Sequence, residues 1–492
     1  MLALSFPRFG HPAFAWIALV PLLVALFGGE RRPSSSRTLR SFSLGLVAGV
    51  AYFAGTVYWT SAVIRTYGGL SLPVAIFAAG ALVAYLALFP AVFSLTMSWL
   101  RARLGISAIL LAPAVWVTAE LARAYFWSGF PWVLLGYSQT EVLPIAQFAS
   151  LFGVYGVSAL VALANAALAY VALKRSRAAI LAAAAVGVVI AGVAVWGNGR
   201  LQDSALTRQG SPMRVALVQG NIPQEQKWDP AHANAIVETY LRMTRDAARQ
   251  GARFVVWPES STPFYFEEDR LDAERIRTVV RETGVELLLG SDQMERGSPP
   301  LYYNSAFVLR ADGSTGGSYR KMFLVPFGEY VPLKRLLFFV APLVEGVGDF
   351  SPGQAMVTLP VDGFKASTAI CYEIVYPGLV RRAVLAGSQL LTTITNDAWY
   401  GQSSAPYQHF EQAAMRAIEQ GRYLARSANT GISGIVDPYG RVITRSPLFE
   451  PAVLVGEVRF LSGLTVYGRT GDLFAYLCVA LTVAAMIMAW RG

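Results

Sequence analysis

The sequence predicts a multi-pass α-helical membrane bundle that carries one globular α/β domain. Long uncharged apolar runs fill residues 1–196 and return in 471–492, whereas 197–470 has the composition of a soluble domain. Of the 492 residues, 54% are hydrophobic and 15% are charged, compared with about 25% charged residues in typical soluble proteins. A chain of this length also exceeds the size at which a single core stops growing. We therefore expect a membrane protein with one large globular insert.

The expected membrane spans are the apolar runs that approach the ~20 residues needed to cross a bilayer. They lie near 12–28, 42–64, 72–99, 106–122, 147–173, 179–196 and 472–490. Arginine and lysine cluster in alternate loops, at 31–40, 101–103 and 174–177, and such loops face the cytoplasm. By this count 197–470 is extracytoplasmic, and the N-terminus also begins outside.

The outer loop at 126–139, "FWSGFPWVLLGYSQ", is unusually aromatic. This composition suits a segment in the outer interface, with Trp127 and Trp132 at the level of the lipid headgroups. An aromatic belt and a contact with substrate are both compatible with it.

The distribution of basic residues, cysteines and histidines argues against several other classes of protein. The net charge of +10 does not predict nucleic-acid binding, because the basic residues lie in short loops where membrane topology explains them. Two cysteines, Cys371 and Cys478, lie in different regions and are not expected to form a disulfide. Three scattered histidines provide no metal-ligand spacing, so neither a metal nor a cofactor is expected.

Within 197–470, apolar strand-like runs alternate with helical patterns. The expected strands are 213–222, 253–260, 285–292, 304–310, 365–373, 389–397 and 433–440, and the expected helices are 231–250, 268–282, 376–387 and 408–421. Nearly continuous apolar strands indicate a sheet that is covered on both faces. Turn signals near 312 and 438 predict hairpins, and therefore a mixed sheet.

Three apolar runs end in a reactive side chain: Glu259 after "VVWP", Lys321 after "SYR" and Cys371 after "STAI". Sites form where strands end, since the loops diverge there. A carboxylate could take the thiol proton, the thiolate could hold an acyl group as a thioester, and an ammonium could stabilise the oxyanion. Each residue also has an ordinary interpretation. Cys371 could fill a core, Glu259 could cap a helix, and Lys321 could be solvated beside Arg320.

The three segments in their order resemble one enzyme superfamily. "WPES", "RKMFLVPFGEYVP" and "ICYE" are similar to the Glu–Lys–Cys triad motifs of the nitrilase, or carbon–nitrogen hydrolase, superfamily. The resemblance covers roughly 213–460 and implies an αββα sandwich. It implies that Glu259 is the base, Lys321 the oxyanion-stabilising cation and Cys371 the nucleophile. Glu329 resembles a second glutamate that orients the lysine.

A nitrilase-like domain between membrane spans resembles one family in particular, the apolipoprotein N-acyltransferases. "QGNIPQEQKWDP" (219–230) is similar to the start of that family's catalytic domain, and the resemblance implies that the loop bearing Trp228 gates the site. Residues 129–139 and 6–23 are similar to its membrane half. The family has eight spans with both termini in the cytoplasm. Seven are counted here, so a first span is expected to be absent from this start.

The resemblance implies a two-step acyl transfer without a cofactor. Cys371 would accept the sn-1 acyl chain of a phospholipid, phosphatidylethanolamine by resemblance, and pass it to the α-amino group of a diacylglyceryl apolipoprotein. The expected location is the bacterial inner membrane, with the catalytic domain on the periplasmic side. Tyr372 and Glu373 are expected to shape the pocket or to support the structure. The apolar segment 333–346 is either an arm that dips toward the bilayer or part of the core.

Two rival functions remain open from the residues. A membrane-anchored amidase or nitrilase acting on a small carbon–nitrogen substrate would share the triad, but such a substrate needs neither six preceding spans nor the Trp228 loop. A transporter or receptor with a degenerate nitrilase-like sensor would not need all three triad residues.

Overall fold

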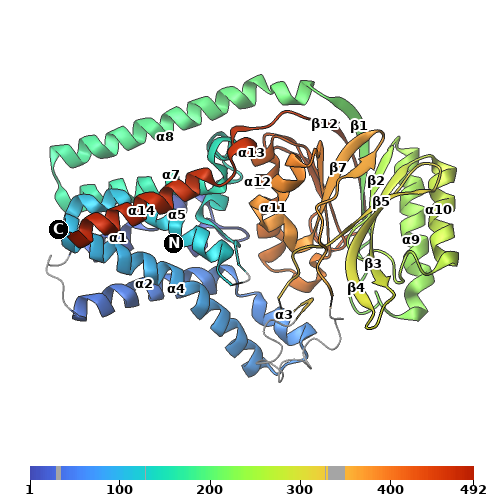
Figure 1. Ribbon diagram of the computed structural model, residues 1–492, viewed down its shortest axis with the longest axis horizontal. Coiled ribbons are helices and arrows are strands. Elements are labelled where there is room, and N and C mark those ends of the chain that lie inside the picture. Colours follow the sequence, from blue (N-terminus) through green and yellow to red (C-terminus); the bar gives the residue numbers. More distant parts are fainter. Residues whose placement is uncertain (29–34, 128, 327, 331–349, 492) are drawn as a thin grey trace.

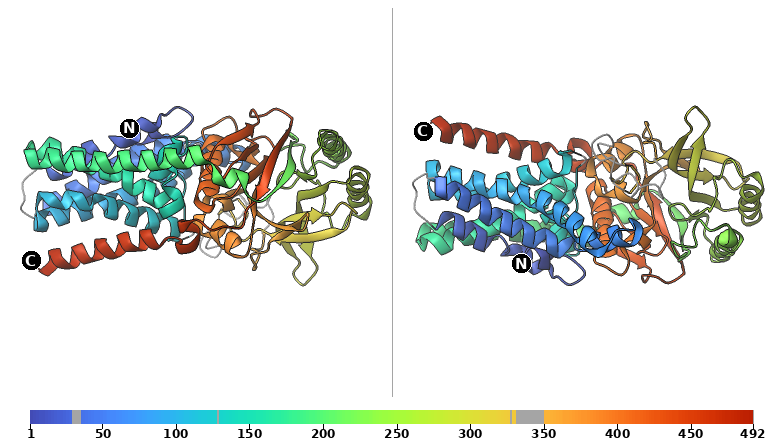
Figure 2. Two further views of the ribbon diagram at one scale, coloured as in Figure 1. Left: turned by 90° about the horizontal axis from the view of Figure 1, so that it is seen from above. Right: turned by 90° about the horizontal axis from the view of Figure 1, so that it is seen from below.

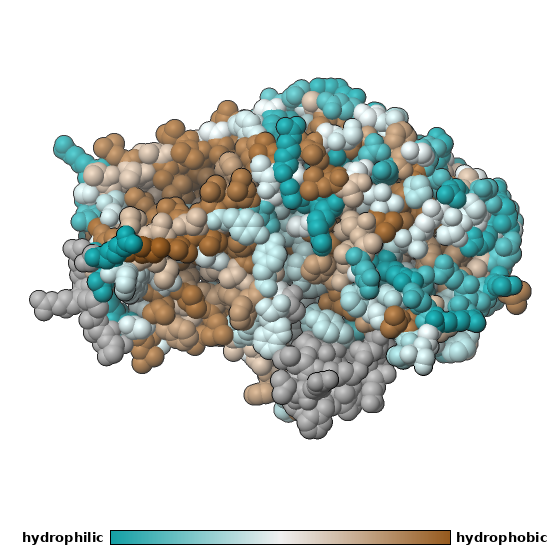
Figure 3. All heavy atoms as spheres, in the orientation of Figure 1, coloured by the Kyte–Doolittle hydropathy of each residue, from teal (hydrophilic) through white to brown (hydrophobic). Residues whose placement is uncertain are grey.

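The computed structural model describes residues 1–28, 35–127, 129–326, 328–330 and 350–491. The molecule is elongated, with a helical part at one end and an α/β part at the other (Figure 1), and the two further views in Figure 2 agree. Hydrophobic residues gather over the helical end in Figure 3, whereas the far end of the α/β part is mostly hydrophilic. The expected segment at 333–346 lies outside the described residues.

The helical part is built from mostly apolar helices of different lengths and short 3-10 turns. Its α-helices are α1 (Val20–Phe27), α2 (Ser35–Thr56), α3 (Thr60–Tyr67), α4 (Leu72–Leu104), α5 (Ala112–Tyr125), α6 (Leu143–Ala146), α7 (Ala149–Lys174), α8 (Arg177–Asp203), α13 (Val466–Thr470) and α14 (Leu473–Arg491). Its 3-10 turns are η1 (Ala3–Ser5), η2 (Pro12–Trp16), η3 (Ile106–Leu111), η4 (Leu135–Gln139) and η5 (Ala205–Arg208). Helix α8 runs the length of this part and leads into the α/β part, while α14 returns to the far end (Figure 1).

Fewer helices can cross a membrane than the seven spans expected from the sequence. Among the residues described, five helices are long and apolar enough, or six if α2 and α3, bent by 56°, form one span. The expected span at 12–28 is instead divided into η2 and α1. Pro12 and Pro21 each lie in the first turn of a helix, which is where proline is tolerated because that N–H needs no partner. The run therefore contains two short helices.

The α/β part contains two six-stranded sheets, of order β12-β1-β2-β3-β4-β5 and β11-β10-β9-β8-β7-β6. The strands are β1 (Ser211–Gln219), β2 (Phe254–Val256), β3 (Glu286–Glu295), β4 (Leu301–Leu309), β5 (Thr315–Arg320), β6 (Leu359–Val361), β7 (Phe364–Ile370), β8 (Leu390–Thr395), β9 (Leu424–Ala428), β10 (Gly434–Val436), β11 (Val442–Arg445) and β12 (Ala452–Phe460). Neighbours β1–β2–β3 and β7–β8–β9 are parallel, and the remaining pairs are antiparallel. The predicted mixed pairing is confirmed, although it is divided between two sheets.

Two helices cover the outer face of each sheet and complete the predicted αββα sandwich (Figure 1). Helices α9 (Pro230–Arg249) and α10 (Arg270–Thr283) cover the first sheet, and α11 (Pro377–Leu385) and α12 (Ala405–Gln420) cover the second. Asp229 and Asp269 cap the first two helices by accepting backbone N–H bonds, which satisfies groups that a helix start leaves unpaired. Apolar side chains from both sheets, such as Leu217 and Ile394, form the core between them.

Helix α12 lies between the second sheet and the helical part, and it joins the two firmly. Trp132 Nε1 from the helical part donates to Gln408 Oε1 at 2.8 Å. Glu419 accepts a bond from the Val154 N–H at 2.9 Å and pairs with Arg416 at 3.1 Å. Arg416 and Glu419 are fully buried, so separating the two parts would break the Val154 bond to a buried carboxylate, which is costly. The second sheet is therefore held at a fixed position against the helical part.

Candidate active site

Cys371 lies immediately after β7, at a sharp turn into the 3-10 helix η7 (Cys371–Val375). Its φ is +52°, a left-handed conformation that is unfavourable for a residue with a Cβ. Two hydrogen bonds near the turn hold it there. The Ile370 N–H donates to Glu373 Oε2 at 2.8 Å, and the His409 Nε2 lies 3.2 Å from the Cys371 carbonyl oxygen. The expected strand at 365–373 therefore ends at Ile370, and the thiol sits at the end of the strand.

Lys321, which follows β5 directly, lies between two buried carboxylates. Its Nζ is 2.8 Å from Glu329 Oε1 and 3.3 Å from Glu259 Oε1. Asn304 on β4 donates to the same two oxygens, at 3.0 Å to Glu329 and 2.7 Å to Glu259. The second Glu259 oxygen accepts the Asn396 N–H at 2.9 Å. The structure thus brings Glu259, Lys321 and Glu329 together in one hydrogen-bonded cluster.

The charges in this cluster stabilise one another. Burial acts to raise the pKa of Glu259, but Lys321, the Asn304 amide and Lys227 hold that pKa below its ordinary value. Burial acts to lower the pKa of Lys321, but Glu329 and Glu259 raise it above its ordinary value. The ion cluster is therefore charged at neutral pH, with a carboxylate available at Glu259 as a proton acceptor.

The Cys371 thiol is uncharged in the free protein. Burial raises its pKa, the nearby negative charge of Glu259 raises it further, and Lys321 opposes them. Both groups are thus close enough to act on the thiol electrostatically. A neutral thiol beside an ionised carboxylate fits general-base catalysis, in which the proton moves as the sulfur attacks.

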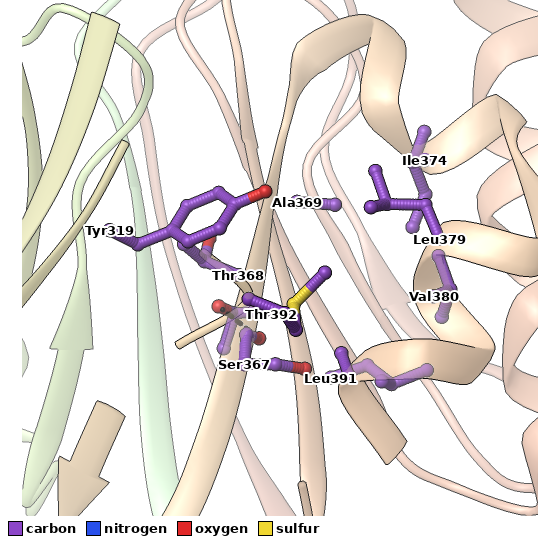
Figure 4. A pocket seen from close by; sticks show the side chains of 11 residues that line it. Tyr319, Ser367, Thr368, Ala369, Ile374, Leu379, Val380, Leu391 and Thr392 are labelled. Carbon is purple, nitrogen blue, oxygen red and sulfur yellow. Dashed lines mark hydrogen bonds between the residues drawn. The ribbon is translucent and has the colours of Figure 1, made fainter. Parts of the chain in front are cut away.

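Glu373, for which the sequence left two interpretations, connects the Cys371 turn to the Lys321 segment. Its Oε1 accepts bonds from the Met322 N–H at 2.7 Å, the Phe323 N–H at 3.1 Å and the Tyr319 hydroxyl at 2.8 Å. Burial raises its pKa to about 6. Figure 4 shows Tyr319 reaching toward β7 beside a small cavity that lies between the sheet and α11. Glu373 is thus a structural link between the Cys371 turn and the segment that follows Lys321.

Tyr372 connects the Cys371 turn to the helical part. Its ring stacks on that of Trp132 with 6.3 Å between centroids and an interplanar angle of 15°. Its hydroxyl donates to the Gly129 carbonyl at 3.5 Å, as does the Tyr376 hydroxyl at 3.3 Å. The residue after the thiol therefore contacts the aromatic segment 126–139.

A buried network behind Cys371 was not predicted from the sequence. His409 lies between the Cys371 carbonyl and Asp397 Oδ1, which is 3.0 Å from its Nδ1, and Arg426 donates to Asp397 Oδ2 at 2.8 Å. Although burial acts to raise the pKa of Asp397, Arg426 and His409 lower it to about 2. The only signal was a lone histidine in a helical pattern, which has many ordinary explanations.

Trp228 is half exposed, whereas the preceding Lys227 is buried. The Lys227 Nζ donates to the Glu259 carbonyl oxygen at 3.0 Å, so the segment that carries Trp228 reaches the cluster through its neighbour. Across the described ranges, no group of three or more histidine, cysteine or acidic side chains is arranged to hold a metal ion.

Both parts of the chain match known protein families. Residues 214–462 match the carbon–nitrogen hydrolase family model, and residues 1–167 match the apolipoprotein N-acyltransferase N-terminal domain. The chain is 42% identical to the apolipoprotein N-acyltransferase of Geobacter metallireducens over 498 aligned positions, covering 100% of this chain and 94% of that protein. The chain belongs to the apolipoprotein N-acyltransferase family.

A second relative agrees with this assignment. The apolipoprotein N-acyltransferase of Methylococcus capsulatus is 35% identical, with 94% of this chain and 90% of that protein covered. A solved amidase of the nitrilase superfamily from Nesterenkonia is 22% identical, covers 55% of this chain and 97% of its own, and has a TM-score of 0.42. The predicted family and the predicted combination of helical bundle and nitrilase-like domain are confirmed. The chain is an acyltransferase with a carbon–nitrogen hydrolase domain.

Proposed function

We propose that this enzyme transfers an acyl chain from a membrane phospholipid, through a thioester on Cys371, to the α-amino group of a diacylglyceryl apolipoprotein. Phosphatidylethanolamine is the proposed donor. The proposed location is the bacterial inner membrane, with the sandwich on the periplasmic side. Family membership supports the lipoprotein acceptor, since relatives are named for that activity.

The observation that carries the lipid donor is the position of Cys371 at the junction of the two parts. Tyr372, next to the thiol, stacks on Trp132 and hydrogen-bonds to Gly129 in the helical part. Moving an acyl chain from hydrocarbon into water costs about 0.8 kcal/mol per CH₂ group. A nucleophile at this junction allows the chains of both substrates to remain in the membrane while their headgroups react.

The first half-reaction forms the thioester. The Cys371 sulfur attacks the ester carbonyl of the phospholipid, and Glu259 accepts the thiol proton. Lys321 stabilises the negative charge that develops on the carbonyl oxygen. As the C–O bond breaks, Glu259 returns the proton to the leaving oxygen, which releases the lysophospholipid.

In the second half-reaction the acceptor amine attacks the thioester carbonyl. Glu259 accepts a proton from the attacking nitrogen, and the C–S bond breaks. The proton returns to the Cys371 sulfur, which restores the thiol and releases the N-acylated product. Glu259 thus serves both half-reactions, as general base and then as general acid.

Intact-mass measurement tests the proposal directly. Purified enzyme incubated with phosphatidylethanolamine of defined chains should gain the mass of one acyl group, and the Cys371→Ala variant should gain none. Hydroxylamine should release the acyl group if it is a thioester. A protein that instead hydrolyses small amides, and gains no lipid acyl mass, would be the membrane-anchored amidase.

Trp228→Ala tests whether the exposed indole protects the thioester. Water must be excluded from a thioester site, so we expect this variant to release more free fatty acid per transferred chain, or to turn over more slowly. The ratio of fatty acid to N-acyl product, measured with labelled phospholipid, reports the change. Trp490→Ala, which removes an exposed indole at the end of α14, is the comparison variant and should keep both rates. Unchanged rates of both reactions in Trp228→Ala would rule out the lid.

A further inference from the structure

Lys227, a buried lysine that is not part of the proposed triad, contacts the main chain of Glu259, the proposed base. Lys227 is 3% exposed, whereas Trp228 beside it is 49% exposed. The Lys227 Nζ donates to the Glu259 carbonyl oxygen at 3.0 Å. A lysine side chain is rarely buried to this degree unless it is paired. The proposed triad gives no reason for Lys227 to be buried against Glu259.

The segment 223–229 is linked to Glu259 at two places, the main-chain carbonyl and, through Asn396, the carboxylate. On one side is the Lys227 bond to the main chain of Glu259. On the other, Gln224 Oε1 accepts from the Asn396 side-chain amide at 2.7 Å, and the Asn396 N–H donates to Glu259 Oε2 at 2.9 Å. The position of this segment and the surroundings of the base are thus linked through two independent contacts.

We propose that Lys227 is a positioning residue that ties the Trp228 segment to Glu259 and supplies a second positive charge to the site. This inference rests on the proposed role of Glu259 as the base. When the segment is seated, the base has both Lys321 and Lys227 near it. When the segment lifts, the base loses one of these cations, so access to the site and reactivity are coupled.

The surrounding charges support this assignment. Burial lowers the pKa of Lys227 to about 8, and the carboxylates of Glu259 and Asp292 oppose that effect. Lys227 is therefore mostly protonated at neutral pH. Burial raises the pKa of Asp292 to about 7, with Lys227 opposing the rise. The titratable groups that act on this region are Glu259, Asp292, Lys321, Glu329 and Cys371.

The direction of the pH effect follows from the sign of the charge. A protonated Lys227 favours the carboxylate form of Glu259, since it holds the pKa of Glu259 down. Removing that charge raises the pKa of Glu259, and by the same argument it raises the pKa of the Cys371 thiol. The reactivity of the thiol falls at low pH, where Glu259 becomes protonated, and this fall is the low-pH limb of the pH profile. Both pKa changes move this limb toward higher pH.

Alkylation of Cys371 by iodoacetamide measures this limb without any lipid substrate. In a Cys478→Ala background, Lys227→Met should shift the low-pH limb upward by about one pH unit, the lower end of the effect of a close opposite charge. Lys227→Arg retains the charge and should keep the parent profile. Lys365→Met, which removes an exposed lysine, is the matched control and should also keep it.

Hydrogen exchange of the backbone provides a second measurement. The peptide covering 220–229 should exchange faster in Lys227→Met than in the parent or in Lys365→Met. A folded Lys227→Met protein with the parent pH profile would overturn the proposal. If that variant does not fold, Lys227→Gln decides, because it also removes the charge: an upward shift of the profile supports the proposal and the parent profile overturns it. Because no lipid is involved, failure of the phospholipid reaction would leave this result readable on its own.

Discussion

Cys371→Ala should abolish transfer of acyl chains to the apolipoprotein, with a loss in kcat of about 10⁴-fold or more, as for the removal of other catalytic nucleophiles. The proposed reaction stores the acyl group on one atom, the Cys371 sulfur, and alanine provides no substitute. The variant should fold, because the sulfur is a small part of a well-packed turn. Turnover with labelled phospholipid and a diacylglyceryl peptide measures the loss.

Cys478→Ala is the matched control for this prediction. Cys478 lies in α14 of the helical part and has no proposed role, so its removal should leave turnover close to that of the parent. In cells, the Cys371→Ala variant should fail to mature lipoproteins while accumulating in the membrane normally. Maturation at the parental rate would favour the rival interpretation, in which the nitrilase-like domain is a sensor without catalytic activity.

The sequence revealed the candidate triad because its members end strands. Cys371 follows β7, Lys321 follows β5 and Glu259 lies three residues after β2. Strand β5 is two antiparallel steps from β3, so it runs in the direction of β2, and their carboxyl ends share one edge. That is a general property of such sheets, and it could be applied before any coordinates were known.

What the sequence concealed depends on partners distant in the chain. Strand β9 was not predicted, since Arg426 interrupts its apolar pattern, and the residue that neutralises this charge, Asp397, lies 29 positions away. The role of Glu373 could not be assigned, because its partners include the main-chain N–H groups of Met322 and Phe323. Every residue except proline has a main-chain N–H, so residue types do not show which of these groups a side chain will bond. The division of 12–28 into two short helices was concealed by its uniform hydrophobicity.

Lys321→Met should impair both stability and catalysis, for one electrostatic reason. The ammonium is 1% exposed and lies within 3.3 Å of both Glu259 and Glu329. Its removal leaves two buried carboxylates that face each other, and breaking a buried pair in this way costs about 3–5 kcal/mol. We expect a clear drop in Tm in detergent. We also expect a loss in kcat of about 10²–10³-fold, as for removal of one oxyanion-stabilising group.

A neighbouring cation separates this effect from a general loss of charge. Arg320 precedes Lys321 and pairs with Glu295 at 2.7 Å, but its side chain is 32% exposed and that of Glu295 is 49% exposed. Exposed ion pairs contribute about 0–1 kcal/mol. Arg320 also donates to Gln293 Oε1 at 2.7 Å and lies over the Tyr303 ring, so Arg320→Met should lower Tm, but by less than Lys321→Met, and should change kcat only slightly. Equal losses in the two variants would contradict a special role for the buried cation.

The double variant Lys321→Met/Glu329→Gln separates the structural role of Lys321 from its catalytic role. Glu329→Gln removes one of the two carboxylates that Lys321→Met leaves facing each other, so the double variant should regain much of the lost Tm. It should not regain the rate, because neither methionine nor glutamine supplies a positive charge near the oxyanion. A recovery of both properties would mean that Lys321 acts only by holding the two carboxylates together. Recovery of Tm alone would assign it a direct part in the chemistry.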